Sequence, residues 1–229
     1  MNLPNALTGG RIAITPLIAL LPFAASPTPR FIAFALFLVA AASDYADGVL
    51  ARSRKQETNL GRLLDPLADK LLLVGTFVPM YALMHVPDAG SSGASFAANE
   101  LSLYALPFLT PWGDIGLSWW IVAIVLGREV AMTVFRQAAA RRGVVIAAIG
   151  PAKWKTALQL IWQGAAYLWF WVATLAIRHS WSGAPWRAVA FLVGVVGTLA
   201  MTVAVALTLY SLWLYVSRYR RIFAESSAS

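Results

Sequence analysis

The chain has 229 residues, of which 59% are hydrophobic and only 12% are charged, with a formal net charge of +8. A soluble domain carries about 25% charged residues, so this composition excludes an ordinary soluble protein and indicates an integral membrane protein. Cysteine is absent, which excludes disulfides, a thiol nucleophile and a cysteine-ligated metal.

Long apolar runs predict an all-α fold, a bundle of six transmembrane helices forming one membrane domain over residues 1–229. The longest runs exceed the roughly 20 residues that span hydrocarbon, and they lack the alternation of strands. The first run has no basic cluster before it, so we interpret it as a retained helix and not a signal peptide. We expect the helices at about Thr8 to Ala24, Pro29 to Ser53, Leu60 to Met84, Leu117 to Arg142, Lys153 to Arg178 and Pro185 to Arg218.

The remaining segments are expected to be irregular. Residues 86–117, rich in Gly, Ser, Ala and Pro, form an outer loop with a short interfacial helix near residues 101–109. Residues 222–229 form a frayed polar tail.

Basic residues are distributed unevenly, and this predicts the topology. Residues 86–118 contain no Lys or Arg, and only Arg30, Arg178 and Arg187 lie in the turns after the first and fifth helices. The positive-inside rule therefore places both termini in the cytoplasm. We expect the basic excess to contact anionic membrane lipids and no nucleic acid. The topology suits a bacterial inner membrane, with an organelle membrane as the alternative.

Four of the ten acidic residues lie at the cytoplasmic ends of the second and third helices: Asp44, Asp47, Asp65 and Asp69. Helical spacing places the first two on one face and the last two on another. If the two faces meet, four carboxylates surround a space that suits two hard divalent cations and phosphate oxygens. Gly48 and Ala51 leave room for a bulky ligand, and Arg52 offers a phosphate a cationic fork. The pattern indicates a membrane phosphotransferase.

The string from Asp44 to Asp69 reads D-x-x-D-G-x-x-A-R, eight residues, then G-x-x-x-D-x-x-x-D. It resembles the signature of the CDP-alcohol phosphatidyltransferase family at every fixed position. The resemblance implies a six-helix membrane fold, a homodimer, and displacement of CMP from a CDP-linked lipid by an alcohol.

The resemblance also implies the roles of individual residues. Two divalent cations, Mg²⁺ or Mn²⁺, would bind to the four aspartates, and Asp69 would also act as the base on the acceptor hydroxyl. The CDP-lipid would contact Gly48, Ala51, Arg52, Thr58 and Gly61. Asn5 and Thr8, with Arg11, could line the nucleotide side at the inner end of the first helix. Alternatively, Asn5 and Thr8 are only helix caps.

Other strings bear on the acceptor alcohol. Residues 2–11, 64–70, 127–136 and 153–159 resemble the branch of the family that forms phosphatidylglycerophosphate, with CDP-diacylglycerol and glycerol 3-phosphate as substrates. Pro151-Ala152 departs from that branch, where a glycine is expected. A small dianion needs a basic pocket, and we expect its phosphate to be bound by Arg128, Arg136, Lys153 and Lys155. The alternatives are that Arg128 only pairs with Glu129 and that Lys155 snorkels to the surface.

Three other functions compete with this prediction. The same family can use another acceptor: phosphatidylglycerol in a cardiolipin synthase, inositol phosphate, or serine. Neutral and lipid acceptors need fewer basic residues. A membrane prenyltransferase also binds diphosphate through aspartates, but it would need two aspartate-rich motifs. A non-catalytic cation transporter would place its carboxylates near the middle of the bilayer and not at helix ends.

Overall fold

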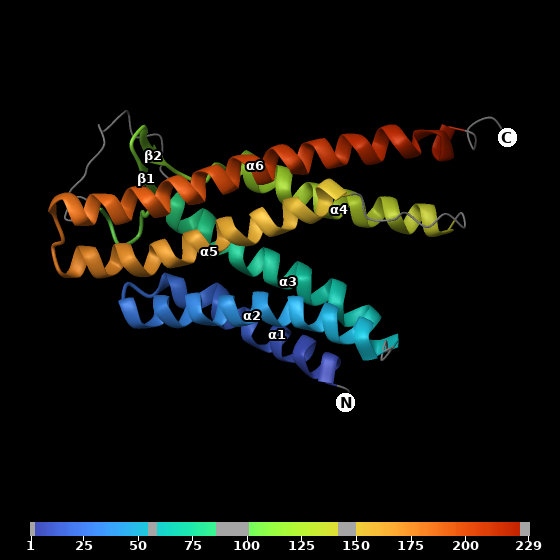
Figure 1. Cartoon of the computed structure of the whole chain (residues 1–229), viewed down its shortest axis with the longest axis horizontal. Helices are drawn as coiled ribbons and strands as arrows, with labels where there is room; N and C mark the ends of the chain where they lie inside the picture. Colours follow the sequence, from blue (N-terminus) through green and yellow to red (C-terminus); the bar gives the residue numbers. More distant parts are fainter. Residues whose placement is uncertain (1–2, 55–58, 86–100, 142–149, 225–229) are drawn as a thin grey trace. The chain divides into compact units, whose positions relative to one another are not determined.

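The computed structural model describes residues 3–54, 59–85, 101–141 and 150–224, and side chains for residues 5–44, 64, 66–85, 101–141 and 154–217. The prediction of a mainly helical chain is confirmed (Figure 1). The helices are α1 (Leu3–Leu20), a 3-10 turn η1 (Leu21–Phe23), α2 (Pro27–Arg54), α3 (Asn59–Met84), α4 (Trp119–Arg141), α5 (Gly150–Arg178) and α6 (Gly183–Ala224). Two short strands, β1 (Phe108–Thr110) and β2 (Gly113–Ile115), lie between α3 and α4.

Four of the described helices are long and apolar enough to cross a membrane. These candidate spans are Asn5–Phe23, Pro66–Met84, Trp154–Arg178 and Gly183–Ser217. Large apolar side chains such as Leu20 and Leu192 are 66% exposed, as expected for surfaces that face lipid. The chain is therefore an integral membrane protein.

The chain divides into two compact units, which are described separately. The first unit comprises Met1–Leu117 and Gln163–Gly197, and the second comprises Ser118–Trp162 and Thr198–Ser229. Both α5 and α6 contribute residues to each unit. Within the first unit, α1 packs against α2 and α3 (Figure 1).

Polar groups in the core of the first unit are paired by hydrogen bonds, as a low-dielectric interior requires. Gln163 of α5 donates from Nε2 to Thr76 Oγ1 of α3 at 2.9 Å. Tyr167 of α5 donates its hydroxyl to the carbonyl oxygen of Ile18 in α1 at 3.1 Å. These bonds fasten α5 to α1 and α3.

Residues 101–117 contain a β-hairpin at 108–115 and no helix at 101–109, so the prediction of an interfacial helix there is wrong. Phe108 pairs with Ile115 and Thr110 with Gly113 in antiparallel register. Gly113 has a φ of +122°, which glycine adopts readily, and Thr110 Oγ1 donates to its carbonyl oxygen at 2.6 Å. Local turn chemistry therefore makes a hairpin where a short helix was expected, and the described residues are otherwise mainly helical.

The start of α1 and the end of α6 differ most from the sequence prediction. Helix α1 begins at Leu3, five residues earlier than expected, so Asn5 and Thr8 lie inside it. The interpretation of these two residues as N-caps is therefore wrong. Helix α6 continues to Ala224, so residues 222–224 are helical and the predicted frayed tail starts too early.

Candidate active site

The aspartate motif lies on the two helices that the sequence predicts. Asp44, Asp47, Gly48, Ala51 and Arg52 belong to α2, and Gly61, Asp65 and Asp69 belong to α3. Thr58 lies outside the described residues. Of these residues, only Asp44 and Asp69 have described side chains, so the structure gives the geometry of those two carboxylates.

Arg11 joins the two halves of the motif. Its Nη1 donates to Asp44 Oδ1 at 2.6 Å and to Asp69 Oδ1 at 2.9 Å. Arg11 is 2% exposed, whereas Asp44 and Asp69 are 46% and 59% exposed. Carboxylates from α2 and α3 therefore meet at one guanidinium nitrogen of α1, which approaches them from the protein interior.

This geometry fits a hard divalent cation. Carboxylate oxygens are the ligands that such cations prefer, and here two of them come together from different helices with much of each carboxylate exposed. Among the described side chains, no group of three or more His, Cys, Asp or Glu residues could hold a metal. Asp47 and Asp65, the other predicted ligands, lie outside that set.

Two polar residues precede Arg11 on α1. Asn5 is 8% exposed and Thr8 is 1% exposed. Their spacing of three residues places Asn5, Thr8 and Arg11 along one face of the helix. The N-terminal half of α1 thus has a buried polar face that ends at the two aspartates.

A second charged cluster lies in the second unit. Arg128 of α4 donates from Nη1 to Glu129 Oε1 at 2.9 Å and from Nη2 to Ser211 Oγ of α6 at 3.3 Å. Lys155 of α5 pairs with the same Glu129 oxygen. One carboxylate therefore serves two cations, which leaves the cluster with a net positive charge.

The predicted phosphate-binding residues differ in their surroundings. Arg128 is 7% exposed and Lys155 is 4% exposed. The pairing of Arg128 with Glu129 is present, and Lys155 does not extend to the surface. Among the described residues, Arg128 Nε is buried without a hydrogen-bond partner. Arg136 is exposed. The Lys153 side chain is not described, although the residue lies in α5.

Sequence reasoning missed three features of these clusters: Arg11 as the centre of the aspartate pair, Glu129 as a shared carboxylate, and Ser211 as a partner of Arg128. Arg11 has one local signal, because it is the only charged residue in α1. Ser211 lies 83 residues from Arg128, so no local signal in the sequence could have identified it as a partner.

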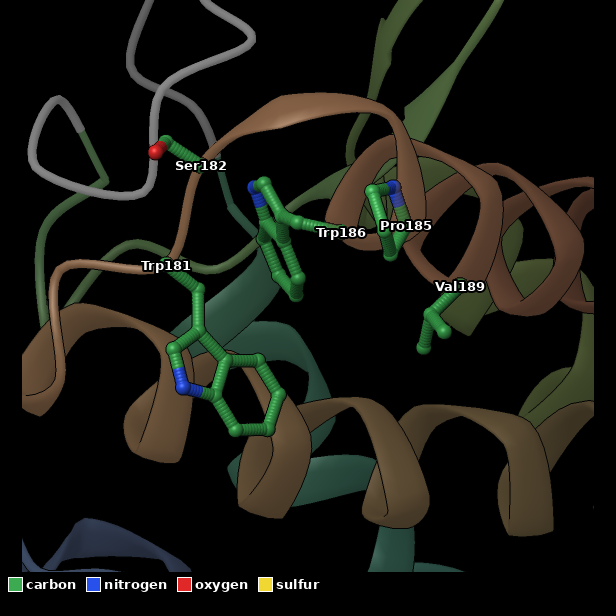
Figure 2. Close-up of a pocket in the computed structure, with 5 residues that line it drawn as sticks. All are labelled: Trp181, Ser182, Pro185, Trp186 and Val189. Carbon is green, nitrogen blue, oxygen red and sulfur yellow. The ribbon is translucent and has the colours of Figure 1, made fainter.

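A pocket of about 310 Å³ lies at the turn between α5 and α6 (Figure 2). Its lining residues are Trp181, Ser182, Pro185, Trp186 and Val189, so it contains no titratable group. Arg178, just before this turn, donates to the carbonyl oxygen of Ala25 at 3.0 Å. Ala25 lies next to the start of α2 at Pro27, and Asp44 lies about 25 Å along that helix from Pro27, as calculated from the helical rise of 1.5 Å per residue. The pocket and the aspartates therefore lie at opposite ends of the first unit.

Comparison with known proteins agrees with the motif. The family model for CDP-alcohol phosphatidyltransferase matches residues 1–217. The CDP-diacylglycerol–glycerol-3-phosphate 3-phosphatidyltransferase of Bacillus subtilis is 30% identical over 229 residues, covering 95% of this chain and 94% of the relative.

Two further relatives match a smaller part of the chain. The "Probable phosphatidylglycerophosphate synthase" of Mycobacterium tuberculosis is 33% identical over 72% of this chain, and the match spans 63% of that relative's length. The CMP-forming cardiolipin synthase of Oryza sativa is 30% identical over 70% of this chain and 44% of the relative. With a family match that extends over nearly all of its length, this chain belongs to the CDP-alcohol phosphatidyltransferase family.

Proposed function

We propose that the chain transfers the phosphatidyl group of CDP-diacylglycerol to glycerol 3-phosphate, forming phosphatidylglycerophosphate and releasing CMP. The observation that carries this proposal is the meeting of Asp44 and Asp69 at Arg11, which places carboxylates from both halves of the motif together. The names of the relatives from Bacillus subtilis and Mycobacterium tuberculosis favour glycerol 3-phosphate as the acceptor.

Four residues would hold two hard divalent cations such as Mg²⁺ or Mn²⁺: Asp44, Asp47, Asp65 and Asp69. When bound, such ions neutralise the diphosphate and the departing CMP. The chain's own residues bind the rest of the nucleotide lipid: Asn5, Thr8, Gly48, Ala51, Arg52, Thr58 and Gly61.

Asp69 acts as the general base. Its carboxylate takes the proton of the primary hydroxyl of glycerol 3-phosphate. The hydroxyl oxygen then forms a bond to the β-phosphorus of CDP-diacylglycerol, and the bond from that phosphorus to the CMP oxygen breaks. The exposure of Asp69 supports this role, because a base must be accessible to the acceptor.

Basic residues bind the acceptor phosphate. Arg128 and Lys155 share one carboxylate and so retain positive charge for an anion. Arg128 Nε, which has no hydrogen-bond partner among the described residues, supplies a further donor. Arg136 and Lys153 complete the set. A dianionic acceptor suits this surplus of cations better than a neutral alcohol does.

We further propose six membrane spans with both termini in the cytoplasm. Helices α2 and α4, with 28 and 23 residues, are long enough to join the four candidate spans. The location of basic residues supports this topology and a cytoplasmic active site in a bacterial inner membrane. Anionic lipids contact the basic residues, and two copies of the chain form a homodimer.

A cardiolipin synthase is the second candidate, supported by the similarity to the enzyme from Oryza sativa. Its acceptor would be phosphatidylglycerol, which carries one phosphodiester charge and a large apolar body. The acceptor would then depend less on Arg128 and Lys155.

CMP release by the purified protein tests the proposal. Glycerol 3-phosphate, phosphatidylglycerol, inositol phosphate and serine are each supplied separately with CDP-diacylglycerol and Mg²⁺. We expect release only with glycerol 3-phosphate and its loss on adding EDTA. Release only with another acceptor would overturn the acceptor assignment. No release with any of them, from folded protein, would overturn the proposed activity.

A further inference from the structure

We propose that Arg11 is a positioning residue of the metal site: it orients Asp44 and Asp69 for a divalent cation and touches neither the cation nor the substrates. The inference rests on the proposed function only in that a divalent cation binds these carboxylates. Its basis is a three-helix ion cluster in which one nitrogen of α1 contacts one oxygen from α2 and one from α3.

The burial of Arg11 requires these two partners. At 2% exposure, the guanidinium of Arg11 is a buried cation. Such a cation is costly unless carboxylates or other acceptors compensate it. Asp44 and Asp69 are in turn like charges that repel each other. Arg11 attracts both carboxylates, which offsets their mutual repulsion and stabilises the ends of α1, α2 and α3 that carry these three residues.

The direction of approach separates positioning from ligation. Arg11 lies on the buried side of both aspartates, and each carboxylate remains about half exposed. The exposed side of each carboxylate is therefore available to a cation, while the guanidinium fixes the orientation of the carboxylate from its buried side. Partners that orient ligands in this way typically affect metal affinity by about 10–100-fold.

The substitution Arg11→Lys tests this role, because it keeps the charge and removes the planar guanidinium. If Arg11 orients the carboxylates, the lysine variant should need about tenfold more Mg²⁺ for half of the metal-dependent rise in melting temperature. Melting is measured on the purified full-length protein without substrate, so the result does not depend on catalysis. Saturating Mg²⁺ should restore most of the variant's turnover, as expected for a residue outside the reacting groups.

A second variant, Arg11→Met, separates orientation from charge neutralisation. If Arg11 only neutralised the aspartates, its removal would leave more negative charge and strengthen Mg²⁺ binding. We expect weaker binding. Tighter binding in Arg11→Met, or an unchanged Mg²⁺ midpoint in Arg11→Lys, would overturn the inference.

Arg30→Lys is the matched control. Arg30 is 1% exposed and links segments of the first unit, but among the described residues it donates to two carbonyl oxygens and to Thr174 and pairs with no carboxylate. This variant should melt at a lower temperature and keep the wild-type Mg²⁺ midpoint. An equal Mg²⁺ shift in both lysine variants would mean that the effect is general loss of stability, and would also overturn the inference.

Failure of the positioning role of Arg11 can be distinguished from failure of the proposed function. Absence of CMP release with every acceptor, together with a Mg²⁺ shift in Arg11→Lys, would refute the activity and leave the positioning role intact. A wild-type protein whose melting temperature does not respond to Mg²⁺ or Mn²⁺ would refute both the metal site and the role of Arg11.

Discussion

The ring of Phe108 in β1 packs against Gly197 of α6 at the position where any other residue would carry its Cβ. A Cβ there would lie 2.6 Å from Cε2 and 2.8 Å from Cε1 of the ring. One turn earlier, a Cβ at Gly194 would meet the backbone carbonyl group of Leu109. The hairpin therefore approaches α6 closely because two glycines of α6 leave room for it.

We expect Gly197→Ala to destabilise the protein by about 1–3 kcal/mol, the usual cost of overpacking. Gly194→Ala should cost more, because the backbone of Leu109 cannot rotate away as a side chain can. Thermal unfolding in detergent measures both. Gly127→Ala in α4 is the control, since nothing lies within 4 Å of its added Cβ. Equal melting temperatures for all three variants would contradict the close packing of the hairpin against α6.

Asp69→Asn should abolish turnover while CDP-diacylglycerol binding stays close to normal. The amide has nearly the same shape but cannot accept the hydroxyl proton at neutral pH. Its oxygen can still accept the hydrogen bond from Arg11. Rates are measured as CMP release, and binding by titration with the nucleotide lipid. Near-normal turnover would remove Asp69 from the role of base.

Arg128→Ala should chiefly weaken glycerol 3-phosphate binding. Loss of a charge-assisted contact costs about 1.5–3 kcal/mol, which corresponds to a rise in acceptor KM of about 10-fold or more. The KM for CDP-diacylglycerol should change little. Ser211→Ala is the control, because it removes a hydrogen-bond partner of Arg128 and keeps the guanidinium. An unchanged acceptor KM in Arg128→Ala would exclude it from phosphate binding.

Arg30→Met should loosen the end of the first unit that lies opposite the aspartates. Arg30 donates to Pro22 O at 2.9 Å, to Leu103 O at 2.6 Å and to Thr174 Oγ1. Leaving buried acceptors without a donor costs about 1–3 kcal/mol each. We expect a lower melting temperature and faster amide hydrogen exchange in residues 101–110. Arg178→Met, which removes one exposed bond to Ala25, should change exchange in that segment little.

The helices and the aspartate motif could be predicted from sequence because both depend on local spacing. Apolar runs mark helices, and the motif residues fall on α2 and α3 as expected. The hairpin at residues 108–115 could not be predicted from apolar composition, because it depends on the turn at Gly113 and on room beside Gly194 and Gly197.

The partners of Arg11 and Arg128 could not be predicted for a different reason. Arg11 lies 33 residues from Asp44 and 58 from Asp69, and Arg128 lies 83 residues from Ser211. Such contacts depend on which helices pack together, and helical periodicity does not specify this. The neighbouring pair Arg128 and Glu129 was open to prediction because it is local.

The positions of Arg11 and Arg30 along the chain also suggest an order of assembly during synthesis. Arg11, Asp44 and Asp69 all belong to the first three helices, so their ion cluster can form before the later helices have been made. The hydrogen bonds of Arg30 can form only after Leu103 and then Thr174, which lies 144 residues after Arg30, have been synthesised. A growing chain can therefore pair its buried Arg11 with carboxylates early, while the contacts of Arg30 form only after most of the chain has been synthesised.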